Sequence, residues 1–549
     1  MKRVWFVVAL LFVWIWGAPG APQAPQHFSI DPRSDSVSSI DPRWDSVFSI
    51  DPRSDSRPSI DPPSSRFAIG AAMAQARGEL RVAIPWTPEN LDPTMNLASI
   101  RAAVGASLFD SLVGRDADGK IVPELAESWK NLDDTTWQFK LRRGVVFHNG
   151  EPFKAEAVRF TMQRVLDPEQ KSPNRANIAE IARVDVVDDA TVNLVTAKPY
   201  APLLNRLVDF PIVPPKYTAE KGNQGLTLRP VGTGPFKFVS LVKDDHLIVE
   251  AFDRHWRGAP KIAKITFKPI PEPFTRTAAL RNNEVDLITT VPPNLGRELD
   301  RQPGIKVQRV PSTWRIYLGL NALKKPLSDV RVRQALNYAT DVDSIVKNVM
   351  DGNGKRTEGP ITANMFGYDA SVHGYAPDPA KAKRLLAEAG YPDGLEITLE
   401  SPQGRYQGDK EIAEALGGQW QKAGFKPKVV ISEWGAYFKR YLGKQFQDAY
   451  LLGLGGPMQD ADELYNLVSS KGRGLYYKNE RVDALFDLGR GTLDPAKRRR
   501  AYSDLAKTMI EDATWVFLMQ QVDIYGQRDR LIWTPRADQW MRFETATIK

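Results

Sequence analysis

The chain has 549 residues, 42% of them hydrophobic and 10% aromatic, so it can bury the cores of several domains or of two large lobes. Its net charge of +8 arises from 74 Lys and Arg against 66 Asp and Glu spread along the sequence. The longest basic cluster, 497–500, is predicted to form a solvated helix face, because it lacks the basic arm or interleaved aromatics of a nucleic-acid-binding surface. The complete lack of cysteine excludes disulfides, thiolate metal sites, a cysteine nucleophile and a lipid anchor on an N-terminal cysteine.

Residues 1–28 are predicted to contain a secretory signal peptide. Lys2 and Arg3 precede the thirteen apolar residues of 4–16, and small residues that permit cleavage follow. The apolar segment is shorter than the roughly 20 residues that a membrane-spanning helix needs. A second stretch of small residues, AAMAQA at 71–76, lies directly before the first predicted strand, so two positions remain open for the start of the mature protein.

A ten-residue repeat separates these two stretches. Four copies, each beginning Ser-Ile-Asp-Pro, fill 29–68, and their proline, aspartate and serine residues favour turns and disorder over a packed core. The period is too short for a solenoid of paired helices. We interpret 29–76 as a disordered insertion in which 67–76 is the displaced tail of the original signal. A misassigned start codon, and a flexible tether or interaction tail, are the alternatives.

From residue 78 onward, strand and helix patterns are mixed without a regular βαβ count, which predicts an α/β or α+β protein. Apolar runs and alternation predict strands at 137–142, 191–196, 246–252 and 264–270. Asp-Pro pairs at 378–379 and 494–495 predict helix starts, and a helical pattern that begins at Ser328 starts again at Asp341.

Known motifs for catalysis and metal binding are missing from the sequence. It contains no Gly-x-Ser-x-Gly, His-Glu-x-x-His or Walker motif. VGTGPF (231–236) lacks the lysine and hydroxyl of a phosphate loop, and DADGK (116–120) lacks most ligands of a calcium loop, so both are interpreted as turns. The histidines that we considered as metal ligands never fall at ligand spacing; they are His27, His148, His246, His255 and His373. We expect no cofactor and no enzymatic activity, and the alternative is a site formed by distant residues.

Six phrases are informative through their order along the chain. They are LDPTMNLASIRAAVGASLFDSLVGRDADGKIVPELAESW, TWQFKLRRGVVFHNGEPFKAEAVRF, PVGTGPFKF, FDRHWRGAPKIAKITF, LGLNALKKPLSDVRVRQALNYATD and DPAKAKRLLAEAGYPDG. In this order they resemble the landmarks of solute-binding protein family 5, the dipeptide, oligopeptide and nickel group that serves ABC importers. The resemblance covers roughly residue 78 to the C-terminus.

The resemblance implies an α/β fold of two lobes, a periplasmic-binding-protein clamp that is type II-like with an extra subdomain in lobe I. Lobe I would comprise 78–310, with the subdomain at about 119–225, and a C-terminal return at 520–549; lobe II would comprise 311–519. A small-molecule or peptide ligand would lie between the lobes. ABC transporter permease subunits at the inner membrane would recognise the closed conformation of the two lobes. The protein would be a soluble periplasmic monomer without a nucleic-acid partner.

The resemblance also implies which residues contact the ligand. They are Asn96, Leu97 and Ser99 after the LDP phrase; Arg405, Tyr406 and Trp434; and Leu454, Gly455, Gly456, Pro457 and Asp460. Arg405 would hold a ligand carboxylate through two parallel hydrogen bonds. The alternative is an ordinary arginine in a surface loop.

Position 457 departs from the pattern of the family. Peptide-binding relatives place an aspartate just after the glycines to pair with the ligand's ammonium group, whereas this sequence has Pro457. Asp460 or Asp462 is an alternative partner for that group, and a modified peptide, an opine-like conjugate or a sugar derivative is an alternative ligand. A secreted enzyme, a nickel-complex-binding protein and a chemosensory protein are the alternative functions.

His148 is interpreted as a structural residue. It lies in LRRGVVFHNGEPFKAEAVRF (141–160), where WQFKLRRGVVF predicts a strand, HNGEPF a turn and KAEAVRF the start of a helix. We expect His148 to end the strand, to hydrogen-bond locally and to lie away from the ligand.

Overall fold

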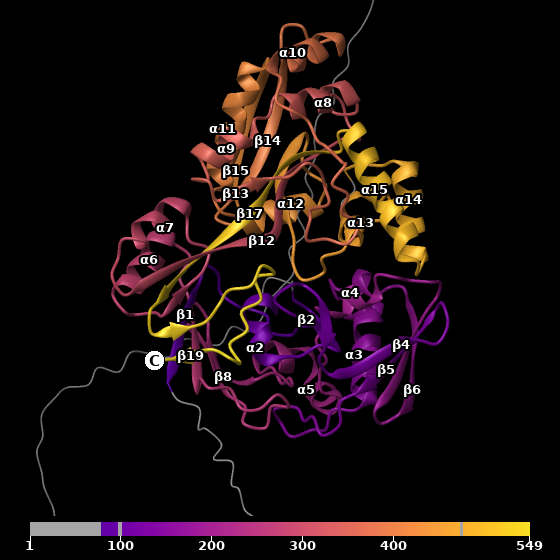
Figure 1. Ribbon diagram of the computed structural model, residues 1–549, viewed down its shortest axis with the longest axis vertical. Helices are drawn as coiled ribbons and strands as arrows, with labels where there is room; N and C mark the ends of the chain where they lie inside the picture. Colours follow the sequence, from indigo (N-terminus) through magenta and orange to yellow (C-terminus); the bar gives the residue numbers. More distant parts are fainter. Residues whose placement is uncertain (1–77, 97–100, 473–475) are drawn as a thin grey trace, which may run out of the picture. The chain divides into compact units, whose positions relative to one another are not determined.

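The structure, a computed structural model, describes residues 78–96, 101–472 and 476–549 of the chain (Figure 1). All of these residues belong to one unit, 72–549, by their internal contacts. The predicted signal peptide and the repeat lie outside the described residues, as do Leu97 and Ser99.

The largest sheet has eleven strands in the described part of the chain and mixes parallel with antiparallel pairs. The strands are β1 (Glu79–Ile84), β8 (Phe236–Val242), β9 (His246–Ala251), β10 (Lys264–Pro269), β11 (Leu287–Ile288), β12 (Ile305–Leu320), β13 (Gly354–Arg356), β14 (Leu395–Gln403), β15 (Phe425–Glu433), β16 (Ala449–Leu454) and β17 (Trp515–Arg528). Their order is β15-β14-β16-β12-β17-β11-β1-β10-β9-β8, and β13 pairs with β17. The predicted strands at 246–252 and 264–270 are observed as β9 and β10.

The helices of the described residues begin in different ways, some at a capping side chain and others without one. They are α2 (Ala106–Leu108), α3 (Ala155–Leu166), α4 (Leu203–Leu207), α5 (Pro215–Leu228), α6 (Pro273–Arg281), α7 (Pro293–Leu299), α8 (Val330–Tyr338), α9 (Val342–Asn348), α10 (Pro379–Glu388), α11 (Asp409–Lys422), α12 (Trp434–Leu442), α13 (Tyr465–Val468), α14 (Glu480–Gly491) and α15 (Pro495–Glu511). Asp378 and Asp494 accept hydrogen bonds from backbone N–H groups at the starts of α10 and α15. Asp341 does the same for α9, and Asp329 for α8, which therefore starts two residues after Ser328.

Two long strands connect the halves of the large sheet. β12 and β17 pair antiparallel along almost their whole length and lie side by side at the centre of Figure 1. The register shifts between Pro311 and Arg315, so residues 312–314 leave the ladder as a bulge, which bends a strand and re-aims its side chains. The chain passes from one half of the molecule to the other at this bulge.

Separate hydrophobic cores lie on the two sides of the bulge. Two clusters take their buried members only from 316–519, and two others take theirs only from 80–299 and 524–546. A side chain that reaches one set of cores therefore does not contribute to the other. This separation supports the lobe boundaries expected near 310 and 519, which stay a prediction.

A smaller antiparallel sheet packs against α3 and has a core of its own, with buried members from 112–212. Its order is β4-β5-β7-β6, and its strands and the remaining short ones are β2 (Val113–Arg115), β3 (Ile121–Pro123), β4 (Ala126–Asn131), β5 (Thr136–Leu141), β6 (Ile181–Asp188), β7 (Thr191–Thr196), β18 (Leu531–Ile532) and β19 (Thr547–Ile548). The predicted strands at 137–142 and 191–196 are observed as β5 and β7. The sheet falls within the expected subdomain, whose limits also stay a prediction.

His148 joins this region to a glycine-rich turn distant in sequence. Its Nε2 lies 3.0 Å from the Gly234 carbonyl oxygen, and Gly232 N–H donates to its Nδ1 at 3.2 Å. The expectation that His148 ends a strand is wrong, because β5 already ends at Leu141, and its bonds are not local. Burial lowers the pKa of His148 to about 4, so the imidazole is neutral at pH 7.

The turn that His148 contacts requires glycine. A Cβ on Gly232 would come within 2.1 Å of the Leu108 carbonyl oxygen, and one on Gly234 within 2.4 Å of the Leu108 carbonyl carbon. VGTGPF is therefore a turn in close backbone contact, as the sequence predicts, and not a phosphate loop.

We predict that His148→Gln lowers the free energy of unfolding by about 1–2 kcal/mol, because the Gly232 N–H loses its acceptor. Ligand affinity should not change. Since the pKa of His148 is lowered by folding, the wild type should lose stability as the pH falls from about 6.5 to about 4, and the variant should lose less. Denaturant unfolding at both pH values, with the exposed His373→Gln as control, checks this. A loss of ligand affinity with intact folding would contradict the structural role.

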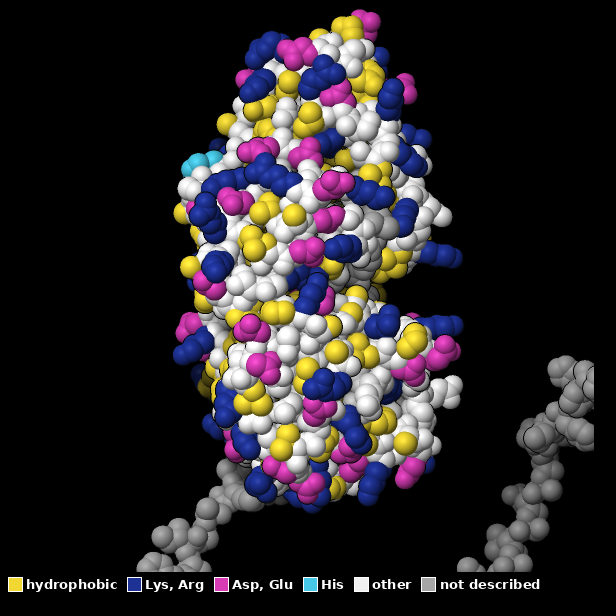
Figure 2. Space-filling model, turned by 90° about the vertical axis from the view of Figure 1, so that its right-hand side faces the viewer, with side chains coloured by type: hydrophobic (Ala, Val, Ile, Leu, Met, Phe, Trp, Pro, Cys, Tyr) yellow, Lys and Arg dark blue, Asp and Glu magenta, His cyan; other side chains and the backbone are white. Residues whose placement is uncertain are grey.

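The surface carries its charges mixed. Figure 2 shows Lys and Arg side chains interspersed with Asp and Glu over the face that it presents. In the basic cluster, Lys497, Arg499 and Arg500 are exposed, but Arg498 is buried and pairs with Asp460 at 3.0 Å. The prediction of a solvated helix face is therefore wrong for Arg498, because this position of α15 faces a neighbouring segment.

Candidate ligand-binding site

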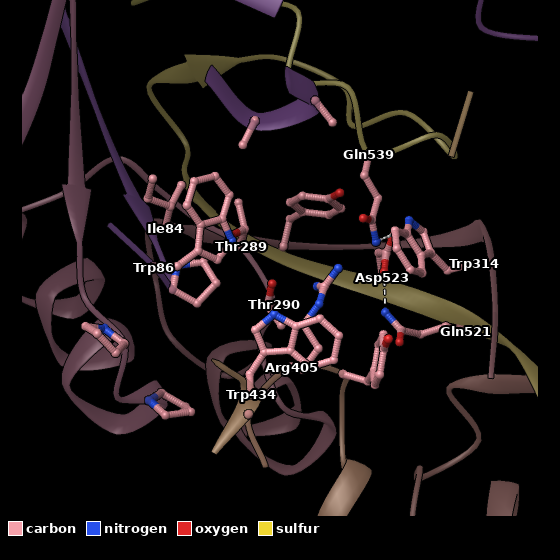
Figure 3. A pocket seen from close by; sticks show the side chains of 18 of the residues that line it. Ile84, Trp86, Thr289, Thr290, Trp314, Arg405, Trp434, Gln521, Asp523 and Gln539 are labelled. Carbon is pink, nitrogen blue, oxygen red and sulfur yellow. Dashed lines mark hydrogen bonds between the residues drawn. The ribbon is translucent and has the colours of Figure 1, made fainter. Parts of the chain in front are cut away.

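A cavity of about 630 Å³ lies where the two halves of the molecule meet beside β17. It is lined by Ile84, Pro85, Trp86, Ala102, Ala103, Pro271, Glu272, Pro273, Thr289, Thr290, Trp314, Gln403, Gly404, Arg405, Tyr406, Glu433, Trp434, Gln521, Asp523, Tyr525, Gln539 and Met541. Figure 3 shows aromatic rings and a few polar groups directed into it. Its volume lies in the range of pockets that bury drug-sized ligands.

Arg405 reaches the cavity from a loop that a buried carboxylate holds in shape. Both oxygens of Asp409 accept backbone hydrogen bonds from the loop, including those of Gly404, Arg405 and Tyr406 at 2.9–3.0 Å. Gly404 has a φ of 77°, a conformation that glycine adopts at low cost. The segment SPQGRYQGDK therefore folds into one rigid turn that projects Arg405.

The guanidinium of Arg405 lies among three aromatic rings. Its Cζ is 5.1–5.2 Å from the ring centroids of Trp314, Tyr406 and Trp434, within the range of cation–π contacts. Among the described residues, no carboxylate oxygen lies within 4.0 Å of its nitrogens. Arg405 thus presents an unneutralised positive charge, positioned by aromatic rings, to whatever occupies the cavity.

Asp523 supplies the opposite charge at another wall of the cavity. It lies on β17 and is only 6% exposed. Its two oxygens accept hydrogen bonds from the side-chain amides of Gln521 at 2.6 Å and Gln539 at 2.8 Å. Burial raises the pKa of Asp523 to about 6, and the hydrogen bonds oppose that rise only in part. The carboxylate is therefore mostly ionised at pH 7 although it is buried.

We predict that Asp523→Asn changes the stability of the ligand-free protein in a pH-dependent way. Because folding raises the pKa of Asp523 from its ordinary value near 4 to about 6, the native carboxyl is favoured at acid pH, and this advantage is lost as the pH rises through 6. Two pKa units correspond to about 3 kcal/mol. The free energy of unfolding of the wild type minus that of the variant should therefore be larger at pH 4.5 than at pH 7.5, by up to that amount. Thermal unfolding at both values checks this, and a difference independent of pH would contradict it.

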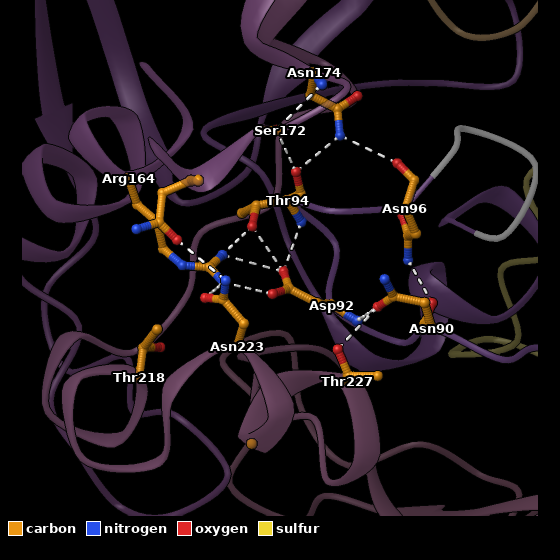
Figure 4. A network of polar contacts seen from close by, with 12 residues as sticks. Asn90, Asp92, Thr94, Asn96, Arg164, Ser172, Asn174, Thr218, Asn223 and Thr227 are labelled. Atoms are coloured by element: carbon orange, nitrogen blue, oxygen red, sulfur yellow. Dashed lines mark hydrogen bonds and ion pairs between the residues drawn. The ribbon is translucent and has the colours of Figure 1, made fainter. Parts of the chain in front are cut away.

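Three of the residues expected to contact ligand, Arg405, Tyr406 and Trp434, lie on the cavity. Asn96 does not: its side chain donates to the Asn90 carbonyl at 3.1 Å, and its own carbonyl accepts from Asn174 at 3.1 Å. Figure 4 shows it at the edge of a polar network that is centred on other side chains. This network fixes the loop after β1.

The centre of that network is a buried ion pair. Asp92 accepts from Arg164 at 2.6 Å and from the Thr94 hydroxyl at 2.7 Å, and both charged side chains are almost fully buried (Figure 4). The aspartate of LDP therefore supplies the carboxylate of an internal ion pair whose arginine comes from α3. Asn96 takes part in this network and is not among the residues that line the cavity, so its contact with a ligand stays a prediction.

The glycine-containing loop at 454–460 also lies off the cavity. Leu454, Gly455, Gly456, Pro457 and Asp460 are not among the lining residues. A Cβ on Gly455 would come within 2.6 Å of the Trp314 Cα, so this glycine permits close packing behind the bulge. The carbonyl oxygens of Pro457 and Met458 accept from Arg115. The loop thus supports the wall that carries Trp314.

The two aspartates considered as substitutes for position 457 are paired with arginines. Asp462 pairs with Arg206 at 2.7 Å and with Arg490 at 2.9 Å, while Asp460 pairs with Arg498. Both carboxylates have no exposed surface. They are committed to internal ion pairs that join α4 to α14 and α15, and they are not aimed into the cavity.

Sequence reasoning missed the C-terminal wall of the cavity. Gln521, Asp523 and Tyr525 come from β17 and Gln539 from the segment after it. The available signal was the run WVFLMQQVDIYGQR, in which polar side chains interrupt an apolar strand. A charge inside a buried strand indicates either an internal partner or a function.

The described residues hold neither a cluster of metal-binding side chains nor a membrane-spanning helix. No group of three or more His, Cys, Asp or Glu side chains there is arranged to hold a metal ion. No helix in that part of the chain is both long and apolar enough to span a bilayer.

Residues 120–475 match the protein family described as "Bacterial extracellular solute-binding proteins, family 5 Middle". The glutathione-binding protein GsiB of Pectobacterium atrosepticum is 29% identical over 466 residues, covering 82% of this chain and 90% of that protein. The dipeptide-binding protein of Escherichia coli is 32% identical over 462 residues, covering 78% and 86%.

A solved structure has a similar fold. The periplasmic binding protein AgaA of A. tumefaciens R10, in complex with agropinic acid, matches with a TM-score of 0.78 and 27% sequence identity. The match covers 86% of this chain and 99% of that one. The similarity therefore includes both halves of the molecule and the strands that connect them.

Proposed function

This chain belongs to the bacterial extracellular solute-binding proteins of family 5, and from that premise we propose that it captures a peptide-like solute with a free carboxylate. The family assignment made from the ordered phrases is confirmed, as is the two-lobed α/β fold. The protein is the substrate-binding component of an ABC importer. Its family consists of binding proteins rather than enzymes.

The observation that carries the proposal is the Arg405 guanidinium, which faces the cavity without a carboxylate partner among the described residues. A planar guanidinium binds a carboxylate through two parallel hydrogen bonds, which lysine cannot do. The three surrounding rings hold the half-buried guanidinium in place. A peptide C-terminus is the simplest ligand group that satisfies it, and the named relatives bind glutathione and dipeptides.

Capture follows from the placement of the cavity across β12 and β17. Arg405 and Trp434 belong to the expected lobe II, whereas Asp523 and Trp86 belong to the expected lobe I. A ligand that touches both sets stabilises the closed arrangement by the difference in its affinity for the two states. The bulge at 312–314 is the natural place for the movement, because its backbone leaves the sheet ladder.

Location and partners form part of the same proposal. An N-terminal signal sends the protein to the periplasm, where it works as a soluble monomer and delivers its ligand to permease subunits at the inner membrane. Membership of a periplasmic binding-protein family supports this location. We propose no nucleic-acid partner, and the mixed surface charge agrees with that (Figure 2).

Native mass spectrometry of freshly purified protein tests the function. We expect a bound solute that carries a carboxylate and that is released chemically unchanged. Protein that binds no peptide, or that converts the peptide to a product, would contradict the proposal and would favour the secreted enzyme. A bound nickel complex, detected by metal analysis, would favour that alternative instead.

A further inference from the structure

In peptide-binding relatives, a loop aspartate pairs with the ligand's ammonium group. In this chain the corresponding loop, 454–460, has no carboxylate available for that pairing. Position 457 is proline, and its carbonyl oxygen accepts from Arg115. Asp460 and Asp462 lie beyond it, fully buried and paired with arginines. A ligand ammonium group in the cavity therefore needs a different counter-charge.

Asp523 is the buried carboxylate of the cavity. Its neighbours Gln521 and Gln539 donate to one oxygen each, and both donors are uncharged. Within the described ranges, no Lys, Arg or His nitrogen lies within 4.0 Å of it. A buried ion without a counter-ion destabilises the fold. Such an ion is typically found where a ligand supplies the missing charge.

The other carboxylates at the cavity are less suited to this role. Glu272 and Glu433 are exposed, and each accepts backbone hydrogen bonds at a helix start: Glu272 at α6 and Glu433 at α12. Solvent screens their charge, and the caps occupy one oxygen of Glu272 and both oxygens of Glu433. Asp523 is buried, fixed from two sides and directed at the space that Arg405 also faces (Figure 3).

We propose that Asp523 receives the ammonium group of the ligand, in place of the loop aspartate that position 457 lacks. The inference rests on the proposed function and narrows its substrate class to solutes with both a cationic amine and a carboxylate. The amine pairs with Asp523, and the carboxylate pairs with Arg405. Trp86 and Tyr525 line the same cavity, and aromatic rings can stabilise a nearby cation.

Two pairs of probes, in each of which one member lacks the charged amine of the other, test this assignment. They are glutathione, N-acetyl-glutathione, the dipeptide Met-Leu and N-acetyl-Met-Leu, titrated by calorimetry against wild type and Asp523→Asn. The wild type should prefer each free amine over its acetylated form by about 10- to 100-fold, the size of a desolvated charge-assisted hydrogen bond. In Asp523→Asn this preference should fall to within about 2-fold, while the affinity for the acetylated peptides stays unchanged.

The acetylated peptides also serve as the folding control, since a misfolded variant would lose them too. Asp487→Asn removes a carboxylate from an exposed pair with Lys471 and should keep the full preference. If Asp523→Asn retains the preference of the wild type, the inference is overturned and the proposed function stands. If neither free peptide binds the wild type with a Kd below about 1 mM, the proposed function fails, and the inference fails with it.

Discussion

Replacement of Arg405 by alanine is expected to lower the affinity for a peptide with a free C-terminal carboxylate by about 2–4 kcal/mol, or roughly 30- to 1000-fold. The variant loses two charge-assisted hydrogen bonds and leaves the ligand carboxylate beside Trp314, Tyr406 and Trp434 without a charged partner. Calorimetric titration with Met-Leu and its C-terminal amide measures the effect. The variant should bind both forms almost equally, because the guanidinium is what separates them.

Two further variants make this result specific. Arg405→Lys keeps the positive charge but not the planar fork, so its affinity should lie between those of wild type and Arg405→Ala. Arg331→Ala removes an exposed arginine that pairs with Asp329 at 2.6 Å, outside the cavity, and should leave binding intact. Unchanged affinity for the free carboxylate in Arg405→Ala would remove Arg405 from the site and leave it an ordinary loop arginine.

The parts of the fold that could be predicted from the sequence are those set by neighbouring residues. Asp378 and Asp494 cap helices because a carboxylate followed by proline satisfies N–H groups within the next three positions. Strands such as β5 and β7 follow from apolar alternation. The order of longer phrases identified the family, and the family carried the two-lobed fold.

The residues that could not be predicted are those whose roles depend on distant partners. Asp460 and Asp462 look available for a ligand in the sequence, yet their partners Arg206, Arg490 and Arg498 approach only in the folded chain. Asp523 shows the converse. Its sequence context signals a charge inside a buried strand but cannot distinguish an internal partner from a ligand, because the lack of a counter-ion is a property of the folded cavity.

The largest stability effect is expected at Asp462, where one carboxylate holds two buried arginines. Asp462→Ala should lower the free energy of unfolding by about 3–5 kcal/mol, because Arg206 loses its partner at 2.7 Å and Arg490 its partner at 2.9 Å. The Tyr200 hydroxyl also loses its acceptor, 3.3 Å away. Denaturant unfolding of the ligand-free variant measures this loss.

Two control experiments separate this structural role of Asp462 from a role in ligand binding. Asp487→Ala breaks the surface pair with Lys471 and should cost less than about 1 kcal/mol, since solvent screens it. Asp462→Asn should be destabilised as well, yet once folded it should keep the preference for a free ligand amine. If it instead kept full stability and lost that preference, Asp462 rather than Asp523 would be the ammonium partner. The buried position of Asp462, between two arginines and away from the cavity, is the reason to expect the first result.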